Sequence, residues 1–528
     1  MKMLKNELEN YLSRQIGEKI HLEMTKEEKF GDFSTNVAFL LAKKSKKTPV
    51  EMAKELVSKI KQNQMIEKIE IASPGFINIY LSKKWLTKNL DEILKQKEDF
   101  GSNNLGQGKK VLVEFISANP TGPLHIGNAR GGPIGDIIAN VLSRAGFKVT
   151  REFYVNDVGN QVNIFGKTLL YWYLKKQGKK IKFPEGGYQG NYVKEIAGSI
   201  KSPKKVSAEY FARHGIKKII KQIKKDCQDM GIVFDNFIYE SDILKKHETK
   251  SVISKLIKHG LAKEKEGALW FLQYVLLRSD KEKTPTYFAN DLAYHLNKYH
   301  RKFDQAIDVL GANTYGHIQK MEDALKALGV KKEFLKIILY QFVRLKHGEK
   351  VEKMSKRLGT YVTARQVLDE VNKDVFRFMM AERAPETHLD FDLKLAKKQS
   401  EENPVYYIQY ASARIHGILA KLKIKNEKLK IPNKNLKLLI NPAEISLIKH
   451  LIRFPDLIYE VTDDLAVHKI TLYALKLATA FHHFYEKCRV IDEKNQAQKK
   501  ARIIQVMCTQ IVLKNTLDIL GIEAKKRM

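Results

Sequence analysis

The sequence is poor in cysteine. Only three occur among 528 residues, and they lie far apart at Cys227, Cys488 and Cys508. They form no CxxC pair and no metal-ligand spacing, which excludes a disulfide scaffold and a cysteine-based zinc site, so we expect no zinc. A chain of this kind suits a reducing compartment, which predicts a cytoplasmic location.

Long hydrophobic runs are also missing. No segment approaches the about 18 consecutive apolar residues that a membrane span requires. The N-terminus reads MKMLKNELENYLSRQIGEKI, which mixes acidic with basic residues and lacks an apolar core. This pattern predicts a helix rather than a targeting peptide. We therefore expect a soluble protein with no membrane partner.

Acidic residues are scarce relative to basic ones. The chain has 94 Lys and Arg against 60 Asp and Glu, a formal net charge of +34. Such a surplus favours a polyanionic partner, because it steers association and releases counterions from a phosphate backbone. A lysine-rich composition that merely keeps the protein soluble is the alternative. The content of 43% hydrophobic and 29% charged residues excludes wholesale disorder.

The patterns along the chain predict a multidomain protein of three parts. Residues 1–105 read as an α+β domain with two strands around a turn at Pro74-Gly75. Residues 106–375 read as a Rossmann-like α/β domain with a parallel sheet, since the apolar run at 111–117 precedes a loop, a helix and a second strand. A lysine-rich helical insertion is expected at about 160–260. Residues 376–528 read as an all-α helical bundle.

A glycine-rich loop follows the first strand of the predicted sheet. It reads ANPTGPLHIGNARGG at 118–132, and its glycines leave room for a flat ligand. The helix N-terminus after it favours phosphate, and His125 could donate to a phosphate oxygen. Taken alone, the loop is equally well explained as a tight turn with a helix-capping histidine.

A cluster of cations lies much later, between Gly348 and Gly359. It reads Lys353-Met354-Ser355-Lys356-Arg357, which fits a mobile clamp on phosphates. Taken alone, such a cluster is more often a basic surface loop.

Together the two motifs resemble the signature pair of class I aminoacyl-tRNA synthetases. The surrounding segments are similar to arginyl-tRNA synthetases from residue 31 to the C-terminus. They include EFISANPTGPLHIGNARGG, REFYVNDVGNQ, TPTYFANDLAYHLNKY, KMSKRLGTYVT, HLDFDLKLA, NPVYYIQYASARI and LGIEAKKRM.

The resemblance implies an arginine–tRNA ligase. Such an enzyme activates L-arginine with ATP to arginyl-adenylate, releasing pyrophosphate, and transfers arginine to the terminal adenosine 2′-hydroxyl of tRNA(Arg), releasing AMP. It implies ATP as a substrate and Mg²⁺ on the phosphates, with no metal site built from protein ligands. The N-terminal domain would contact the outer corner of the tRNA and the helical domain the anticodon. We expect a monomer.

The resemblance also implies roles for individual residues. The catalytic candidates are His125, Asn128, Lys353 and Lys356. The ATP-binding candidates are Pro120, Gly122, His125, Gly127, Asn128, Lys353, Met354, Ser355 and Lys356. The arginine-binding candidates are Glu114, Ser117, Asn119, His125, Tyr287, Asp291 and Asn313. The tRNA-binding candidates are Tyr407, Tyr410, Arg414, Tyr473 and Met528.

The arginine-binding set is chemically reasonable by itself. A guanidinium carries five donors in a planar fork, which carboxylates and carbonyl-type acceptors recognise best. Tyr287 and Asp291 have i,i+4 spacing and should share a helix face. Structural alternatives are a Glu114 ion pair with a structural lysine, a core position for Tyr287, a place for Asp291 in the first turn of its helix, and core packing of the C-terminal aromatic residues.

Two positions depart from the family pattern. Asn128 stands where the family usually has a second histidine, and residues 310–318 read LGANTYGHI where a GADHHGY-like stretch is common. Two other functions remain open on the sequence. A synthetase for lysine would use similar carboxylates, and a non-catalytic RNA-binding relative is supported only by Asn128.

Overall fold

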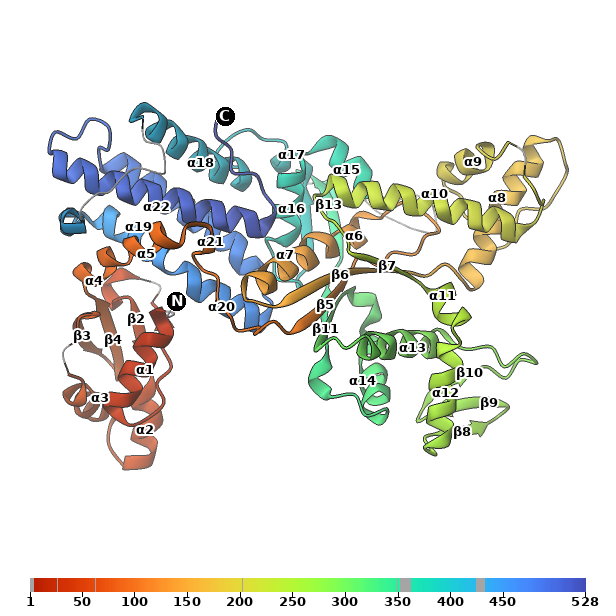
Figure 1. Ribbon diagram of the computed structural model, residues 1–528, viewed down its shortest axis with the longest axis horizontal. Coiled ribbons are helices and arrows are strands. Elements are labelled where there is room, and N and C mark those ends of the chain that lie inside the picture. Colours follow the sequence, from red (N-terminus) through yellow and green to blue (C-terminus); the bar gives the residue numbers. More distant parts are fainter. Residues whose placement is uncertain are drawn as a thin grey trace.

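A computed structural model of the chain describes residues 4–25, 27–61, 63–201, 203–348, 350–351, 362–423 and 433–528. In Figure 1 a small N-terminal unit lies at the lower left, long helices lie above it, and a twisted sheet lies to their right. An α+β unit, a parallel-sheet core and a helical C-terminal part thus follow one another along the chain. This arrangement confirms the predicted fold class.

The N-terminal unit combines helices with one four-stranded antiparallel sheet of order β1-β2-β4-β3. The two strands predicted around Pro74-Gly75 are β3 and β4, with Ile71 opposite Ile77. Buried Ile77 and Ile79 face the core of this unit. Its elements are α1 (Leu4–Ile16), β1 (Glu23–Met24), β2 (Phe33–Thr35), α2 (Val37–Ser45), α3 (Pro49–Lys59), β3 (Ile66–Ala72) and β4 (Phe76–Leu81), followed by α4 (Lys83–Lys88) and α5 (Leu90–Gln96).

The central sheet has five parallel strands in the order β12-β11-β5-β6-β7. Residues 111–115 of β5 are all buried, as the apolar run predicts. The chain steps from β5 to β6 on one side, while β11 lies on the other, so the order reverses at β5. Ligands of such sheets bind where the carboxyl ends of the strands flank this reversal. The elements are β5 (Lys110–Phe115), α6 (Ile126–Ala129), α7 (Gly131–Arg144), β6 (Lys148–Val155), β7 (Asn236–Tyr239), β11 (Gln305–Gly311) and β12 (Leu335–Tyr340).

The expected helical insertion begins with three helices at the upper right of Figure 1. They are α8 (Asn160–Lys176), α9 (Asn191–Gly198) and α10 (Ala208–Asp229). Helix α10 buries isoleucines at positions 216, 219, 220 and 223, as their spacing predicts. The sequence did not predict that β7, a strand of the central sheet, lies inside the range assigned to the insertion. This strand has only four residues, all half-buried, which is too short for a clear period of two.

A second group of elements follows β7. It contains an antiparallel sheet of order β10-β9-β8 at the lower right of Figure 1. The elements are α11 (Glu240–Lys245), α12 (Glu248–Lys258), β8 (Ala262–Lys265), β9 (Ala268–Phe271), β10 (Tyr274–Leu277), α13 (Tyr287–His300) and α14 (Ile318–Ala327). Helix α13 then leads directly into β11.

A small sheet connects the central part to the C-terminal helices. Its order is β14-β13-β15, and β13 pairs in parallel with β15 so that Val343 lies opposite Leu389. Strand β15 lies within residues 376–528, which the sequence predicts to be all helical, so that prediction is wrong at this strand. The elements are β13 (Val343–His347), β14 (Lys350–Val351), α15 (Ala364–Glu370), α16 (Lys373–Ala381), β15 (Leu389–Asp392) and α17 (Leu393–Ala396).

The C-terminal part is a helical bundle around one long apolar helix, α22. Within the described residues only α22 is long and apolar enough to cross a membrane, and 78% of its most apolar window is buried inside the molecule. Its apolar residues thus serve packing against α18, α21 and α5. All three cysteines are buried, unpaired thiols. The helices are α18 (Pro404–Lys421), α19 (Pro442–Ile452), α20 (Phe454–Asp464), α21 (His468–Lys487) and α22 (Gln496–Leu520).

Candidate active site at the carboxyl ends of the parallel strands

Three carboxylates form a row across the central sheet. Strand pairing places Asp308 of β11 opposite Glu114 of β5, and Glu114 opposite Glu152 of β6. All three residues are almost inaccessible to solvent. Adjacent like charges on one face of a sheet repel each other, so the row requires cations from another element.

Helix α13 and its C-terminal capping residue, Arg301, supply these cations. Lys298 Nζ lies 2.6 Å from Glu114 Oε2 and 2.8 Å from Asp308 Oδ1. Arg301 holds both oxygens of Glu152 in a bidentate contact of 2.6 and 2.7 Å. The structural alternative for Glu114, an ion pair with a structural lysine, is therefore correct as far as its Oε2 atom is concerned.

His295 extends the row toward solvent. Its Nε2 lies 2.7 Å from Asp308 Oδ2, and its Nδ1 lies 2.7 Å from the Asp291 carbonyl oxygen and 3.2 Å from Asp291 Oδ1. Both ring nitrogens face only acceptors, so both must carry a proton to donate. Burial and Lys298 lower the pKa of His295, but Asp291 and Asp308 outweigh them and raise it to about 10. The ring is therefore an imidazolium at neutral pH.

The charges of the row depend on one another. Burial raises the pKa of Glu114, and the nearby Lys298 ammonium opposes this effect. Burial also acts on Asp308, but Lys298 and His295 outweigh it and hold the pKa of Asp308 at about 2. The two carboxylates raise the pKa of Lys298 against its burial. The ammonium thus stays charged between its partners.

Tyr287 and Asp291 lie on the solvent-facing part of the same helix. Both belong to α13 with the predicted i,i+4 spacing, and His295 and Lys298 continue this stripe one and two turns further. Tyr287 is 46% exposed, which excludes the core position. The Asp291 side chain is 40% exposed. These two residues are therefore accessible to a ligand above the buried row.

The end of β5 turns sharply into the site. Ile116 and Ser117 adopt φ angles of +69° and +37°, a left-handed backbone that is costly for a β-branched residue such as isoleucine. Ser117 Oγ donates to Glu114 Oε1 at 2.7 Å and accepts from the Tyr154 backbone N–H at 3.0 Å. The exposed Asn119 donates through Nδ2 to Gln161 Oε1 at 3.0 Å. This conformation fixes Glu114 on the site side of the strand end.

Asn313 lies after the neighbouring strand, β11. It is exposed in a 3₁₀ turn over residues 312–317. A Cβ atom at Gly311 would come within 2.8 Å of Asn313 Oδ1, so this turn places the Asn313 amide close to the end of β11. The strand end therefore presents an amide where the family pattern has its GADHHGY-like stretch.

The glycine-rich loop forms the other wall of this region. His125 is the N-cap of α6, and its Nδ1 accepts the Gly127 backbone N–H at 2.8 Å. This bond assigns the proton of a neutral imidazole to Nε2. A Cβ atom at Gly127 would lie 3.0 Å from His125 Nδ1, so a larger residue there would press on the capping ring. Pro120 is buried, and Gly122 is half-buried.

Two later glycines of this loop have a packing role. A Cβ atom at Gly131 would meet the Tyr340 ring at 2.9 Å, and one at Gly132 would meet Ile232 at 2.8 Å. Both glycines are buried within the first turn of α7. The expectation that they leave room for a ligand is therefore wrong. They allow α7 to approach its neighbours closely.

The residues after the lysine cluster return to this loop. The Ile126 N–H donates to the Val362 carbonyl at 3.1 Å, and the Ala364 N–H donates to the Leu124 carbonyl at 2.8 Å. His125 and Thr363 thereby form an antiparallel bridge. Lys353, Met354, Ser355 and Lys356 lie outside the described residues. The described chain resumes at Val362 and contacts the nucleotide-loop candidate there.

The comparisons with known proteins agree with this geometry. Three family models match the chain: the arginyl-tRNA synthetase N-terminal domain at residues 2–81, the catalytic domain of class I tRNA synthetases (R) at 89–392, and the DALR anticodon binding domain at 408–528. The chain belongs to the arginyl-tRNA synthetase family. This result confirms the resemblance that the motifs indicate.

Individual relatives cover nearly the whole chain. An arginine–tRNA ligase of Carboxydothermus hydrogenoformans is 40% identical over 98% of this chain and 96% of its own length. One of Caldanaerobacter subterraneus subsp. tengcongensis is 41% identical over 98% and 96%. Among solved structures, Thermus thermophilus arginyl-tRNA synthetase superposes with a TM-score of 0.80 at 23% identity, covering 100% of both chains.

In this arginyl-tRNA synthetase family member, three of the predicted tRNA-binding residues lie together on α18. The Arg414 guanidinium carbon lies 4.5 Å from the Tyr410 ring centroid and 4.6 Å from that of Tyr485 on α21. The Tyr407 ring lies 4.6 Å from His482, which also comes from α21. These residues form one aromatic and cationic cluster between two helices. Arg414 is already stacked between two rings within the protein.

The C-terminal tail runs along the same helix. Gln409 and Ser412 of α18 donate to the carbonyl oxygens of Glu523 and Lys525 at 3.0 and 2.9 Å. Met528 at the end of this tail is 52% exposed. Met528 is therefore held near α18 by backbone contacts a few residues before it.

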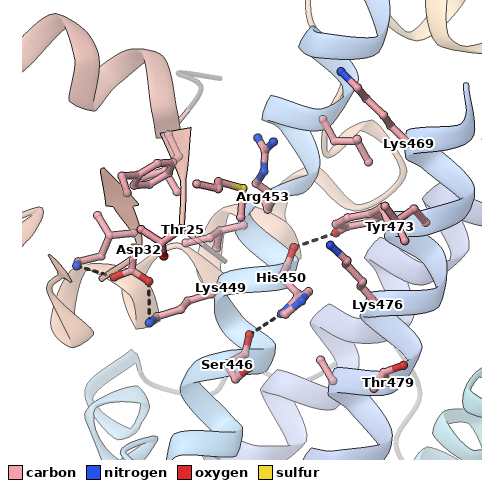
Figure 2. A pocket seen from close by; sticks show the side chains of 18 of the residues that line it. Thr25, Asp32, Ser446, Lys449, His450, Arg453, Lys469, Tyr473, Lys476 and Thr479 are labelled. Carbon is pink, nitrogen blue, oxygen red and sulfur yellow. Dashed lines mark hydrogen bonds and ion pairs between the residues drawn. The ribbon is translucent and has the colours of Figure 1, made fainter. Parts of the chain in front are cut away.

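Tyr473 lies in a different place. It is only 6% exposed, its ring lies 5.7 Å from Phe454, and its hydroxyl donates to the His450 carbonyl at 2.9 Å. Figure 2 shows Tyr473 in the wall of a pocket of about 790 Å³ between the N-terminal unit and helices α19 to α21. Tyr473 thus has the packing role that was the alternative for an aromatic helical stripe. It is not part of the cluster on α18.

Sequence reasoning missed His295, Lys298 and Asp308. A signal was present, because His295 and Lys298 follow Asp291 at helical spacing on a face that is otherwise apolar. Their roles could not be assigned from the sequence, since Glu114 and Lys298 are 184 positions apart and meet only through the fold.

Proposed function

We propose that the protein ligates L-arginine to the terminal adenosine 2′-hydroxyl of tRNA(Arg), through arginyl-adenylate made from ATP. One observation supports this proposal most strongly. The glycine-rich loop at 124–126 hydrogen-bonds to residues 362–364, which follow the lysine cluster in the sequence, beside the strand end that carries Glu114. A phosphate site and a carboxylate site are thereby adjacent.

Arginine would lie against the carboxyl ends of β5 and β11. Tyr287 and Asp291 on α13 and Asn119 in the loop after β5 are its accessible side-chain partners, and the buried Glu114 lies beneath them at the end of β5. Ser117 orients Glu114 through its hydroxyl. His125 and Asn313 would complete the pocket from the glycine loop and from the 3₁₀ turn after β11. Carboxylates suit the guanidinium and the α-ammonium, which both carry a positive charge.

ATP would lie over the glycine loop. Pro120, Gly122 and Gly127 shape the backbone there, and His125 Nε2 is the donor nitrogen for a phosphate oxygen. Asn128 can donate from its amide but cannot become cationic. Lys353 and Lys356, with Met354 and Ser355, would close over the phosphates from the segment that ends beside His125.

The reaction would need little covalent help from side chains. The arginine carboxylate attacks the α-phosphorus of ATP in line, and pyrophosphate leaves. The protein positions the two substrates and stabilises the charge on the phosphates. Mg²⁺ would bind together with the nucleotide, whose phosphate oxygens suit it. Among the described residues no group of three His, Cys, Asp or Glu side chains could hold a metal ion.

The RNA would span the length of the molecule. Tyr407, Tyr410 and Arg414 on α18 remain candidates for contact with the anticodon, because aromatic rings next to cations stack on unpaired bases. Met528 remains a candidate because its tail is held along the same helix. Tyr473 is the weakest candidate. The division at 1–105, 106–375 and 376–528, the monomeric state and the cytoplasmic location belong to the same proposal.

A charging assay tests the proposal. The purified protein is given ATP, total tRNA and either arginine or lysine. Only arginine is expected to become attached to tRNA. Charging with lysine would indicate a synthetase for the other cationic amino acid, and charging with neither amino acid would favour a non-catalytic RNA-binding protein.

A substitution in the lysine cluster tests the activation step. Lys356→Ala is expected to lower ATP–pyrophosphate exchange, measured with tRNA present, by about 100-fold or more, because one charge on the phosphates is lost. Binding of tRNA should change little. An unchanged exchange rate would refute the role of Lys356.

A further inference from the structure

One unbroken series of charged side chains links the two main arginine candidates. It runs Glu114–Lys298–Asp308–His295–Asp291, with successive contacts of 2.6, 2.8, 2.7 and 3.2 Å. Only one end of the series is accessible. The Asp291 side chain is 40% exposed, whereas Glu114 at the strand end and the three middle side chains are each at most 6% exposed.

The middle residues are saturated by the series itself. Lys298 directs its ammonium to Glu114, to Asp308 and to the face of Tyr294, whose centroid is 4.4 Å away. His295 uses both ring nitrogens on Asp308 and Asp291. None of the three has an exposed polar atom to offer to a ligand. They can affect a ligand only through Glu114 and Asp291.

Fold stability alone explains this arrangement poorly. Burying charges is expensive, and well-packed apolar residues in place of a buried ion pair are often equally stable or better. A buried series that emerges at a predicted substrate site has a more specific use. It restricts the rotamers of its two ends, because Glu114 and Asp291 are each held by a buried partner at 2.6 and 3.2 Å.

We propose that Lys298, Asp308 and His295 are positioning residues for arginine, which hold Glu114 and Asp291 in one fixed orientation. The inference rests on the proposed function, because it presupposes that these two carboxylates bind the amino acid. Lys298 ties Glu114 to Asp308, and His295 transmits that position to Asp291 on the next turns of α13. Loss of a middle residue therefore loosens both ends, while the nucleotide loop stays intact.

Steady-state charging kinetics of the full chain test this inference. Lys298→Met keeps an unbranched side chain of similar length and removes the charge. It is expected to raise KM for arginine at least tenfold, while KM for ATP and for tRNA stays within twofold. The matched control is Arg377→Met, which removes another fully buried cation, one paired with Asp136 away from the strand ends. It should leave KM for arginine within twofold.

A double substitution tests the linkage and serves if Lys298→Met does not fold. Glu114→Gln, His295→Gln and the pair are compared by kcat/KM for arginine. Glu114 and His295 do not touch each other, so independent residues would give effects that multiply. If the residues act as one linked series, the fold-loss in kcat/KM of the double variant should be at least threefold smaller than the product of the two single fold-losses. A loss equal to the product would overturn the inference.

The remaining outcomes are also decisive. The inference fails if Lys298→Met leaves KM for arginine unchanged, or raises KM for ATP by the same factor, which would indicate general disruption. If the unsubstituted protein does not charge tRNA with arginine, the proposed function fails first. If the unsubstituted protein charges tRNA with arginine but the variants do not show the expected changes in KM, only the inference fails.

Discussion

Two sets of buried charge in this molecule differ in where they end. The series beneath the strand ends finishes at the accessible Asp291. At the junction between the sheet and the C-terminal helices, Arg377 is completely buried, with Asp136 at 2.6 Å and the carbonyls of Leu520 and Met230 at 2.7 and 3.0 Å. Asp136 also pairs with Arg151, whose side chain is 20% exposed, so this set too reaches solvent, but it includes none of the candidate substrate residues. The difference suggests that the set with Asp291 at its end serves the site and that the other set serves the fold.

The largest expected effect is on the free energy of unfolding, and it should be similar for a substitution in either set. Lys298→Met and Arg377→Met each leave buried carboxylate without one cation, which costs about 3–5 kcal/mol. Urea or thermal unfolding, followed by circular dichroism, should show a clearly lowered midpoint for both. A variant with an unchanged midpoint would show that its charge is not structurally coupled.

The second prediction concerns Asp291, the accessible end of the series at the candidate site. Asp291→Asn keeps the size of the side chain but removes its charge, so kcat/KM for arginine should fall about 10- to 100-fold, equivalent to the about 1.5–3 kcal/mol of a charged hydrogen bond. The unfolding midpoint should hardly move. Asp518→Asn, an exposed carboxylate paired with Lys514 on α22, is the control and should leave charging kinetics unaltered.

The third prediction uses pH. The pKa of His295 is raised from 6.5 to about 10 in the folded protein, so its stabilising contribution is complete below about pH 6.5 and is lost as pH rises toward 10. The difference in unfolding free energy between the unsubstituted protein and His295→Gln should therefore shrink between pH 7 and 10. The slope is at most about 1.4 kcal/mol per pH unit. A constant difference across this range would mean that the ring is neutral.

The smallest effect is expected for a surface pair. Lys514→Gln breaks the 2.6 Å contact with Asp518 on an exposed face of α22. Exposed i,i+4 pairs contribute about 0.3–0.5 kcal/mol, so neither the unfolding midpoint nor KM for arginine should change measurably. A large loss here would weaken the distinction between buried and exposed charge.

Much of the fold could be predicted from the sequence because its signals are local. The apolar run of β5, the isoleucine face of α10 and the turn at Pro74-Gly75 each depend on neighbouring residues alone. Strands β7 and β15 were missed because each has only four residues and pairs with a strand far away in the sequence, β6 and β13 respectively.

The same contrast holds for the candidate site. Glu114 and Asp291 could be named from motif and spacing. Asp308 becomes a neighbour of Glu114 only through the register of β5 with β11, and Lys298 of α13 reaches both carboxylates only in the folded chain. Likewise, the helical pattern places Tyr407 and Tyr473 on helices without saying which one faces the interior. The structure gives the second its buried, hydrogen-bonded position.

The docked C-terminal tail has a practical consequence for work with this protein. Because Gln409 and Ser412 anchor residues 523 and 525 along α18, anything fused after Met528 begins beside that helix. A purification tag placed there would put a chain of arbitrary charge next to Tyr410 and Arg414. Binding measurements with RNA should therefore use protein from which such a tag has been cleaved.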